Sequence, residues 1–427
     1  MTKVEGMKNQ VASVAGLLLL PICVMGDTIN VPTDLPTIDW AVKFAFDGDE
    51  IVVAPGTYVA TTGTVINPQG KSITIRSSGG PEVTFIEGQN QFRGLLCESG
   101  ETSQTIIEGF TIQNCQAPWY DWNGNGQEDY WEYFGGGAWC RDGSSPTIRS
   151  CVFINGVAEY GGGICCFDEA SGENSPTIEN CIFQDNTAGP GVGGAIYSNA
   201  GSPVVIGCEF VGNSAYFGGG IHNYGGSDSV ITDCSFDMNV AQADGGAIYN
   251  DSSMPTVSSC TFTGNSAEDE GGAVFNADPS SNQNIPVFLN CTFEANVAAN
   301  EGGAMQNFSV SPEMTVCNFT DNLASEGGAI YSWNGSNPSL SDSTVCGNSP
   351  DQIVGNWTDG GSNDISDSCG DQNDCPDAND DGQVNVNDVL LIIAAWETAD
   401  ADADVDGDGW VGTNDVLAVL AGWGLCE

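Results

Sequence analysis

The sequence predicts an all-β solenoid of stacked parallel coils, with a short helix before it and a small helical unit after it. A phrase of the form Cys-x-Phe-x-x-Asn-x-Ala, followed by Gly-Gly, recurs at a nearly constant interval, for example from Cys208 to Cys234 and Cys260. The copy at Cys260 continues through Phe262 and Asn265 to Gly271 and Gly272. A fixed period of this length is typical of a solenoid, in which each unit buries its apolar side chains only by stacking on its neighbours.

Four residue types repeat at fixed positions of this phrase, and each has a structural explanation. Cys and Phe are expected in the core, Asn in a ladder of side-chain hydrogen bonds at a turn, and paired Gly where the backbone needs positive φ or close approach. Parallel side chains in one column do not favour disulfides, so these cysteines are expected to be free. The Cys column is Cys151, Cys181, Cys208, Cys234, Cys260, Cys291 and Cys317, and the Asn column is Asn186, Asn213, Asn239, Asn265, Asn296 and Asn322. Cys140 and Cys166 each follow Gly-Gly-Gly and are expected to be neighbours on adjacent coils.

Residues 1–26 have the pattern of a secretory signal peptide. Lys3 and Lys8 precede an apolar run at residues 11–20, and Val24-Met25-Gly26 offers a small-residue cleavage site. A lipoprotein site at Cys23 is the less favoured alternative. We therefore expect a secreted or surface-associated protein without a transmembrane segment.

The mature sequence opens with a predicted helix and then a strand. Apolar residues recur at helical spacing across residues 36–46, after a proline, and a turn, a strand and a second turn follow at residues 47–58. A helix at this point would cover the open end of the stack, where strand edges are unpaired. This segment resembles the N-terminal cap of right-handed parallel β-helix proteins.

The repeats of residues 110–350 resemble those of chlamydial polymorphic outer-membrane proteins and related β-helix adhesins. The resemblance rests on the Gly-Gly-Ala-Ile and Phe-x-x-Asn phrases. It implies a right-handed parallel β-helix over residues 27–366, and it says little about function, because one fold serves many functions.

The strongest chemical signal follows a polar linker at residues 367–374. Residues 375–427 contain two loops, which begin at Asp377 and Asp404, with oxygen-bearing side chains at the spacing that Ca²⁺ requires, and each loop runs into an apolar helix. The side-chain ligands predicted are Asp377, Asn379, Asp381, Asn385 and Asp388 in the first loop and Asp404, Asp406, Asp408 and Asp415 in the second.

These two loops and helices resemble a type I dockerin, the calcium-folded module that docks onto cohesin domains. The resemblance implies backbone carbonyl ligands from Gln383 and Trp410. At the positions where many dockerins carry Ser-Thr, this chain has Val386-Asn387 and Thr413-Asn414, so the resemblance does not specify the partner. A calcium-stabilised tail without a partner is the alternative. Cys375 and Cys426 are candidates for a disulfide that joins the ends of the module, with Cys369 as a competing partner.

A third calcium loop is predicted inside the solenoid, within an insertion at residues 116–135. Its spacing fits the full EF-hand loop pattern. The predicted ligands are Asp121, Asn123, Asn125, the Gln127 carbonyl, Asp129 and Glu132. The alternative is a polar insertion without metal. Its dense aromatic residues suit either stacking on sugar rings or packing onto the coil.

The charge of the chain excludes one class of partner and raises a further question. The formal net charge is −49, and no lysine or arginine follows Arg149. Such a chain does not bind nucleic acid through phosphate neutralisation, and it repels acidic polysaccharides. Asp244, Glu270, Glu301 and Glu326 precede successive Gly-Gly corners, so they would stack and repel unless a cation bridges them; the alternative is that they point into water.

The sequence contains no recognisable catalytic constellation. β-Elimination needs a base, often Lys or Arg, and only six such residues follow the signal peptide. The single histidine, His222, stands where other coils have Tyr, so we interpret it as a surface ladder residue. We expect an exported, calcium-binding β-helix protein that acts in surface adhesion, carbohydrate binding or scaffolding, with a cohesin-like or other protein partner. A polysaccharide lyase or glycoside hydrolase tethered through its dockerin-like module is the alternative.

Overall fold

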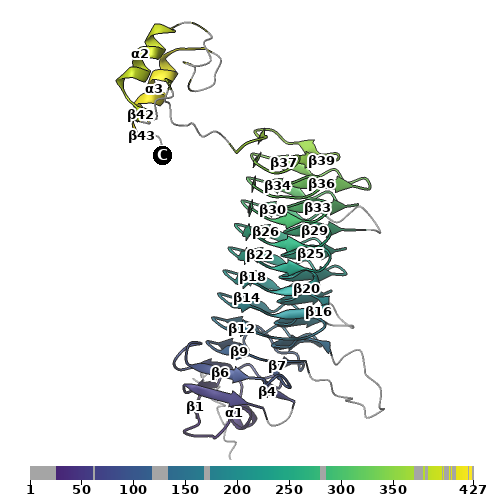
Figure 1. Cartoon of the computed structure of the whole chain (residues 1–427). Helices are drawn as coiled ribbons and strands as arrows, with labels where there is room; N and C mark the ends of the chain where they lie inside the picture. Colours follow the sequence, from purple (N-terminus) through teal and green to yellow (C-terminus); the bar gives the residue numbers. More distant parts are fainter. Residues whose placement is uncertain are drawn as a thin grey trace, which may run out of the picture.

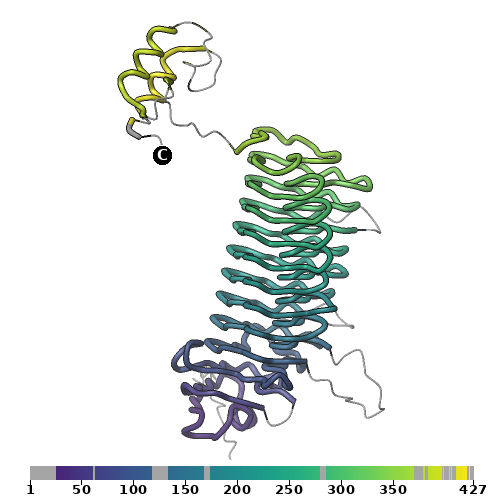
Figure 2. Tube along the Cα trace, viewed as in Figure 1, coloured from purple at the N-terminus to yellow at the C-terminus, as the bar shows by residue number. Residues whose placement is uncertain are grey.

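The chain winds around one axis, and its coils form three long parallel sheets that make up the body of the molecule (Figure 1). The computed structural model describes residues 26–60, 63–117, 133–167, 174–278, 285–369, 378–379, 383–396, 398, 403, 405, 410–421 and 423–425. Each full coil contributes one strand to each of the three sheets, and Figure 2 shows the coils stacked in sequence order along the axis. The predicted right-handed parallel β-helix is therefore the fold of the solenoid.

The first sheet consists of β1 (Thr28–Val31), β2 (Glu50–Val53), β5 (Thr74–Ser77), β8 (Ile106–Glu108), β11 (Thr147–Arg149), β14 (Thr177–Glu179), β18 (Val204–Ile206), β22 (Val230–Thr232), β26 (Thr256–Ser258), β30 (Val287–Leu289), β34 (Glu313–Thr315), β37 (Ser339–Ser341) and β40 (Thr358–Asp359). The second sheet consists of β3 (Gly56–Val59), β6 (Thr84–Glu87), β9 (Thr111–Gln113), β12 (Val152–Ile154), β15 (Ile182–Gln184), β19 (Glu209–Val211), β23 (Ser235–Asp237), β27 (Thr261–Thr263), β31 (Thr292–Glu294), β35 (Asn318–Thr320), β38 (Thr344–Cys346) and β41 (Asp364–Ser366).

The third sheet consists of β4 (Thr64–Ile66), β7 (Arg93–Cys97), β10 (Ala138–Cys140), β13 (Ile164–Phe167), β17 (Ile196–Asn199), β21 (Ile221–Tyr224), β25 (Ile248–Asp251), β29 (Val274–Ala277), β33 (Met305–Phe308), β36 (Ile330–Trp333) and β39 (Ile353–Val354). A shorter fourth sheet, between the second and third along the chain, consists of β16 (Thr187–Val192), β20 (Ser214–Phe217), β24 (Val240–Ala241), β28 (Ser266–Ala267) and β32 (Val297–Ala298).

The third sheet adds a strand at the point of each coil where the repeat phrase indicated only a Gly-Gly corner. A strand begins one residue after the corner, as β29 does after Gly271, Gly272 and Ala273. Gly271 has φ +65°, and a Cβ on Gly272 would lie 2.1 Å from the carbonyl oxygen of Gly303 in the next coil. Both glycines are therefore required, one for its backbone conformation and one for the close approach of coils.

The core of the solenoid is built from the predicted Cys and Phe columns. All seven cysteines of the column are buried and unpaired. The phenylalanines of the column stack face to face, with ring centroids 4.5–5.0 Å apart and planes within 4–7° of parallel. Cys140 and Cys166 are register neighbours in β10 and β13, as expected.

The predicted Asn ladder is also confirmed. Each amide nitrogen donates to the amide oxygen of the next asparagine, at 2.8–3.0 Å, from Asn186 through to Asn348. The asparagines themselves are not left-handed; the residue before each one is, such as Met238 at φ 51° and Ala295 at φ 54°. A second ladder, not predicted, joins Asn223, Asn250, Asn276 and Asn307 in the third sheet at 2.8–2.9 Å.

A helix lies at the N-terminal end of the stack, as the sequence predicted. Helix α1 (Ile38–Phe44) is capped by the Thr37 hydroxyl, which accepts from the Trp40 N–H at 3.2 Å. It packs against β1, β2 and β4 through Ile38, Ala41 and Val42, which are buried. The contact with the first strands of two sheets is consistent with a cap, and that role remains a prediction.

A small helical unit with its own core follows the solenoid. It contains β42 (Gln383–Val384), α2 (Val386–Ala394), α3 (Thr413–Ala421) and β43 (Gly424–Leu425), with β42 and β43 antiparallel. The core residues are Ala378, Val384, Ile392, Ala403, Val411 and Val419. Across the described part of the chain, no helix is long and apolar enough to cross a membrane.

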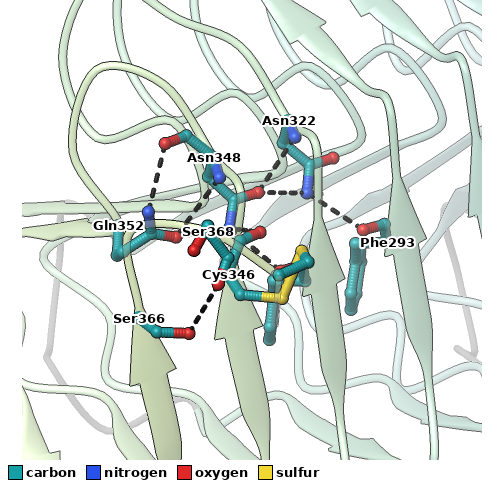
Figure 3. Close-up of a disulfide and its surroundings, with 9 residues drawn as sticks. Phe293, Asn322, Cys346, Asn348, Gln352, Ser366 and Ser368 are labelled. Carbon is teal, nitrogen blue, oxygen red and sulfur yellow. Dashed lines mark hydrogen bonds between the residues drawn. A yellow bond between two sulfur atoms is a disulfide. The ribbon is translucent and has the colours of Figure 1, made fainter. Parts of the chain in front are cut away.

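One disulfide corrects the expectation for Cys369. Cys369 was a candidate partner for the cysteines of the C-terminal unit, but it bonds to Cys346 at the end of β38, with a Cα–Cα distance of 4.4 Å (Figure 3). The bond ties the segment after β41 to the preceding coil, beside the last member of the Asn ladder, Asn348. Cys375 and Cys426, the other predicted pair, lie outside the described residues.

Candidate functional site

The outward face of the third sheet carries the densest set of chemically distinctive side chains. One register position runs through Tyr197, His222, Tyr249, Phe275, Gln306 and Tyr331 on successive strands from β17 to β36. Successive side chains of a strand point to opposite faces, and the neighbours Ile248 and Asn250 point inward and are buried. The side chains at this register position therefore point away from the core. The result is a ladder of rings interrupted by one imidazole and one amide, which we call the outer ladder.

His222 lies inside this ladder and not at the surface. Its side chain is 5% exposed, and the rings of Tyr197, Tyr224 and Tyr249 surround it at centroid distances of 5.6, 6.2 and 4.8 Å. Burial lowers the pKa of His222 to about 3, so the ring is neutral at pH 7. Among the described residues, neither ring nitrogen has a hydrogen-bond partner. The predicted ladder position is confirmed, whereas the predicted surface exposure is wrong.

A second column, adjoining the outer ladder, changes from apolar to acidic along the solenoid. The residue before the first glycine of the corner is Phe134, Tyr160, Val192 and Phe217 in four coils and then Asp244, Glu270, Glu301 and Glu326 in the next four. From Tyr160 onward these residues are in register, because the carbonyl of each accepts from a backbone N–H in the preceding coil, as Asp244 does from Gly218 at 3.1 Å. We call the second half the acidic column.

The acidic column holds carboxyl groups with raised pKa values. Burial, and after it the neighbouring carboxylates of Glu301 and Asp244, raises the pKa of Glu270 to about 7. Burial is also the main cause that raises the pKa of Asp244 to about 6, against a backbone hydrogen bond from the Glu270 N–H at 3.2 Å. Perturbed carboxyl groups of this kind are found at functional sites, although ion-pair networks in a purely structural role perturb pKa values too.

Exposed aromatic residues lie on the same side of the solenoid. Tyr224 and Trp333 are 42% and 59% exposed, and they occupy the next outward position of the third sheet. Tyr216, which is also exposed, packs edge-on against Phe217 with centroids 4.7 Å apart. Exposed rings beside hydrogen-bonding groups are suited to stacking on sugars.

A shallow groove lies on a different face, over the second sheet. Its volume is about 300 Å³, and its lining is mainly hydroxyl and carboxyl groups. The residues are Glu209, Val211, Ser235, Phe236, Asp237, Thr261 and Thr263. It contains neither the histidine nor any residue of the acidic column, so the outer ladder remains the better candidate.

The C-terminal unit contains part of the predicted calcium ligand set. Asp388 and Asp415, the last ligand of each loop, are fully buried. Asp388 accepts from the backbone N–H of Asn385 at 2.7 Å, and Asp415 accepts from that of Gly412 at 2.6 Å, so both loops hold their last carboxylate in the same way. The Asn385 side chain caps α2 by accepting from the Asn387 N–H at 2.8 Å.

The donor chemistry of this unit is compatible with Ca²⁺. Residues 375–427 contain twelve Asp and Glu residues and no Lys, Arg or His, so two buried carboxylates have no cationic side chain there to balance them. Asn379, Gln383 and Trp410 are described, whereas Asp377, Asp381, Asp404, Asp406 and Asp408 lie outside the described residues. Calcium binding therefore stays a prediction.

The predicted loop at residues 121–132 also lies outside the described residues. Of the aromatic residues around it, Phe134 is described and buried. It stacks on Trp139, Tyr160 and Phe167 at 4.8–5.6 Å, so this ring packs onto the coils and is not available to a ligand.

The six basic residues from Lys43 to Arg149 have structural partners. Arg93 is buried and donates to the carbonyls of Phe134 and Gly135, and burial lowers its pKa to about 10. The other contacts are Lys43 over the Trp40 ring, Lys71 with the Val42 and Ala45 carbonyls, Arg76 with Glu50, Arg141 with Glu98 and Asp142, and Arg149 with Glu108. This distribution does not favour a lyase that uses Lys or Arg as its base.

The comparison with protein families agrees with the fold. A family model described as right-handed β-helix region matches residues 44–236 and 171–345. A PL6 family polysaccharide lyase from Pseudopedobacter saltans is similar in structure, with a TM-score of 0.42 and 11% identity over 81% of this chain and 94% of that chain. The PL6 family alginate lyase AlyGC has a TM-score of 0.37 and 13% identity, with 79% of this chain and 50% of that chain covered. The receptor-binding protein of bacteriophage Det7, a tailspike, has a TM-score of 0.25 and 11% identity, with 78% of this chain and 76% of that chain covered. At these TM-scores the likeness carries no argument about function. No curated protein matches the sequence.

Proposed function

The chain belongs to the right-handed β-helix family, and from this premise we propose that it is an extracellular scaffold protein. In this proposal the solenoid binds carbohydrate and the calcium-loaded C-terminal unit docks onto a protein partner. Export follows from the predicted signal peptide, and a net charge of −49 suits a salty or calcium-rich exterior, where ions relieve self-repulsion.

The observation that carries the docking proposal is a duplicated apolar stripe in the C-terminal unit. Each helix and the segment after it expose large apolar side chains at matching positions of the duplication, with exposed fractions of 41–57%. The pairs are Leu390 and Leu417, Ile393 and Leu420, and Trp396 and Trp423. Exposed apolar residues in a unit this small, which has its own buried core, are typical of a binding surface.

The chemistry of the partner follows from the charge around this stripe. Acidic residues surround it in the sequence, and residues 375–427 contain no basic residue. A partner would therefore present an apolar patch with lysine or arginine at its rim. Ca²⁺, held by the loop carboxylates that include Asp388 and Asp415, would supply the positive charge that lets both loops close around it.

The carbohydrate proposal rests on the exposed rings of Tyr216, Tyr224 and Trp333, of which Tyr224 and Trp333 lie on the third sheet. Aromatic faces with adjacent hydrogen-bonding groups suit a neutral sugar chain, and the negative field of the solenoid disfavours uronates. Because the coils repeat along the axis, one chain offers several such positions to a long polysaccharide.

A second candidate function is cleavage of a polysaccharide, and one observation favours it. Asp244 and Glu270 have pKa values raised to about 6 and about 7, which is the range of a general acid at neutral pH. In that case Glu270 would protonate the leaving group and a neighbouring carboxylate would act as base or nucleophile.

The docking proposal is tested with calcium-loaded full-length protein against a panel of cohesin modules by surface plasmon resonance. Leu390→Ala or Leu417→Ala alone should leave binding, because the other helix retains its stripe, whereas the double variant should lose it. A double variant that binds as tightly as the wild type would remove the proposed surface.

The carbohydrate proposal is tested by a screen against plant and algal polysaccharides that reads both binding and release of sugars. Trp333→Ala and Tyr224→Ala should weaken binding several-fold, and Trp357→Ala, a tryptophan packed against the core, serves as control. Release of sugars that Glu270→Gln abolishes would replace the binding proposal with the enzymatic one. Absence of binding to every polysaccharide would contradict both.

A further inference from the structure

The acidic column and the outer ladder meet at Gln306, and this meeting point has the composition of a cation site. The backbone carbonyls of Glu270, Glu301 and Glu326 accept from Gly245, Gly271 and Gly302 at 2.9–3.0 Å, so their side chains leave successive coils from equivalent positions. Adjacent strands lie about 4.8 Å apart, which brings neighbouring carboxylates to within a distance that one cation bridges.

No cationic side chain is available to separate these charges. Lys and Arg are absent from the sequence after Arg149, and the one histidine, His222, is buried and neutral. Glu270 is half-buried and lies beside Asp244 and Glu301, which repel it. Solvent alone screens such a group poorly because part of its surface is removed from water.

The second, independent observation is the amide of Gln306. It occupies the ring position of the outer ladder between Phe275 and Tyr331 and is 1% exposed. Its Nε2 donates to the Glu270 carboxylate at 3.1 Å, while its Oε1 has no hydrogen-bond donor among the described residues. A buried amide oxygen without a donor is destabilising, and a metal ion is one partner that removes the cost.

We propose that the carboxylates of Glu270 and Glu301 and the amide oxygen of Gln306 bind one Ca²⁺ on the outward face of the third sheet. The set contains only oxygen, which selects a hard cation over zinc or copper. Two carboxylates and one amide supply at most five oxygens, and Ca²⁺ takes six to eight, so water completes the sphere.

The site is expected to be weak and specific to this pair of coils. Within the part of the chain that the structure describes, no three His, Cys, Asp or Glu side chains converge on one point, so the site relies on the amide as its third ligand. The strands on either side of Gln306 have Phe275 and Tyr331 at the ladder position, and neither offers an amide oxygen there. With two charged ligands, the dissociation constant should fall near the ~10⁻⁴–10⁻³ M of extracellular calcium modules.

The test is isothermal titration of the calcium-free full-length protein with CaCl₂. The other predicted calcium loops remain intact in every variant, so the measured quantity is the difference between variants. Wild type should bind one more Ca²⁺, in the weak class, than Glu270→Gln/Glu301→Gln. Glu294→Gln, an exposed carboxylate on β31 of the second sheet, is the matched control and should bind as wild type does.

Gln306 provides a pair of variants with opposite expected effects. Gln306→Met keeps the shape, removes the oxygen and should weaken the extra site by about tenfold. Gln306→Glu adds a carboxylate and should tighten it by a similar factor, while it lowers the thermal unfolding midpoint in calcium-free buffer. Equal stoichiometry in wild type and the double Glu→Gln variant, or weaker binding in Gln306→Glu with native circular dichroism, would overturn the site.

Discussion

Removal of one amide from the Asn ladder should destabilise the solenoid more than any single surface change. The Asn265 side chain makes four hydrogen bonds inside the core. Its Oδ1 accepts from the Asn239 backbone N–H and from Asn239 Nδ2, both at 3.0 Å. Its Nδ2 donates to the Phe236 carbonyl at 3.0 Å and to Asn296 Oδ1 at 2.9 Å. Asn265→Ala removes all four, and the buried backbone N–H of Asn239 loses the amide oxygen that accepts from it.

The expected loss follows from the number of bonds. Each hydrogen bond contributes about 1 kcal/mol net to the free energy of unfolding, and a buried group left without a partner costs about 1–3 kcal/mol. Asn265→Ala should therefore cost at least about 4 kcal/mol. Asn265→Asp keeps the shape but replaces a donor with an acceptor that faces the Phe236 carbonyl and Asn296 Oδ1, so it should cost at least as much.

Equilibrium urea unfolding followed by far-ultraviolet circular dichroism measures this loss. Asn337→Ala is the control, because Asn337 is exposed and its amide donates only to the Thr358 hydroxyl, at 2.7 Å. It should cost under about 1 kcal/mol. An Asn265→Ala midpoint equal to that of the control would show that the ladder adds nothing beyond the packing of the coils.

Three further predictions concern the ends of the solenoid, its acidic column and the C-terminal unit. Chelation of Ca²⁺ should abolish the circular dichroism of α2 and α3 while the β signal persists, and Asp388→Ala/Asp415→Ala should have the same effect; helices indifferent to chelator would exclude calcium. Reduction of the Cys346–Cys369 bond, whose cysteines are separated by 23 positions in the sequence, should destabilise the last coil by about 3 kcal/mol, measured as faster amide exchange there. The pKa of Asp244 is raised from 3.8 to about 6 in the fold, so the unfolded chain loses this proton first as pH rises. The free energy of unfolding should therefore fall between pH 4 and pH 6 in calcium-free buffer, and Asp244→Asn should flatten that fall; an unchanged slope would contradict the assignment.

The fold could be predicted because its information is periodic. Cys260, Phe262 and Asn265 each recur in the following coil. Because a side chain in a solenoid stacks on the equivalent side chain of the next coil, the repeat itself shows which residue type each position contacts. The Asn ladder and the buried Cys and Phe columns follow from this rule alone. The third sheet could not be predicted in the same way, because strands such as β29 are buried at all four positions, which hides the alternation expected of a half-buried strand.

The candidate site was harder to predict from the sequence, because it depends on the outer ladder and the acidic column lying side by side in the fold. His222 was identified from its position in the ladder, but its burial depends on Tyr197, Tyr224 and Tyr249, which come from three strands. Gln306 was missed. The signal that could have found it is the single amide in a column of rings, which becomes visible only when the coils are aligned in the register of the third sheet.

The sequence by itself determined a β-solenoid, its period and its core columns, because these depend on contacts between equivalent residues of adjacent coils. The helical spacing of apolar residues indicated the short N-terminal helix in the same way. The tertiary structure decided which outward columns share a face, how Cys369 pairs and where Gln306 lies relative to Glu270. These contacts join residues at different positions in the repeat, so no periodicity records them; they depend on the angles at which the three sheets meet around the axis.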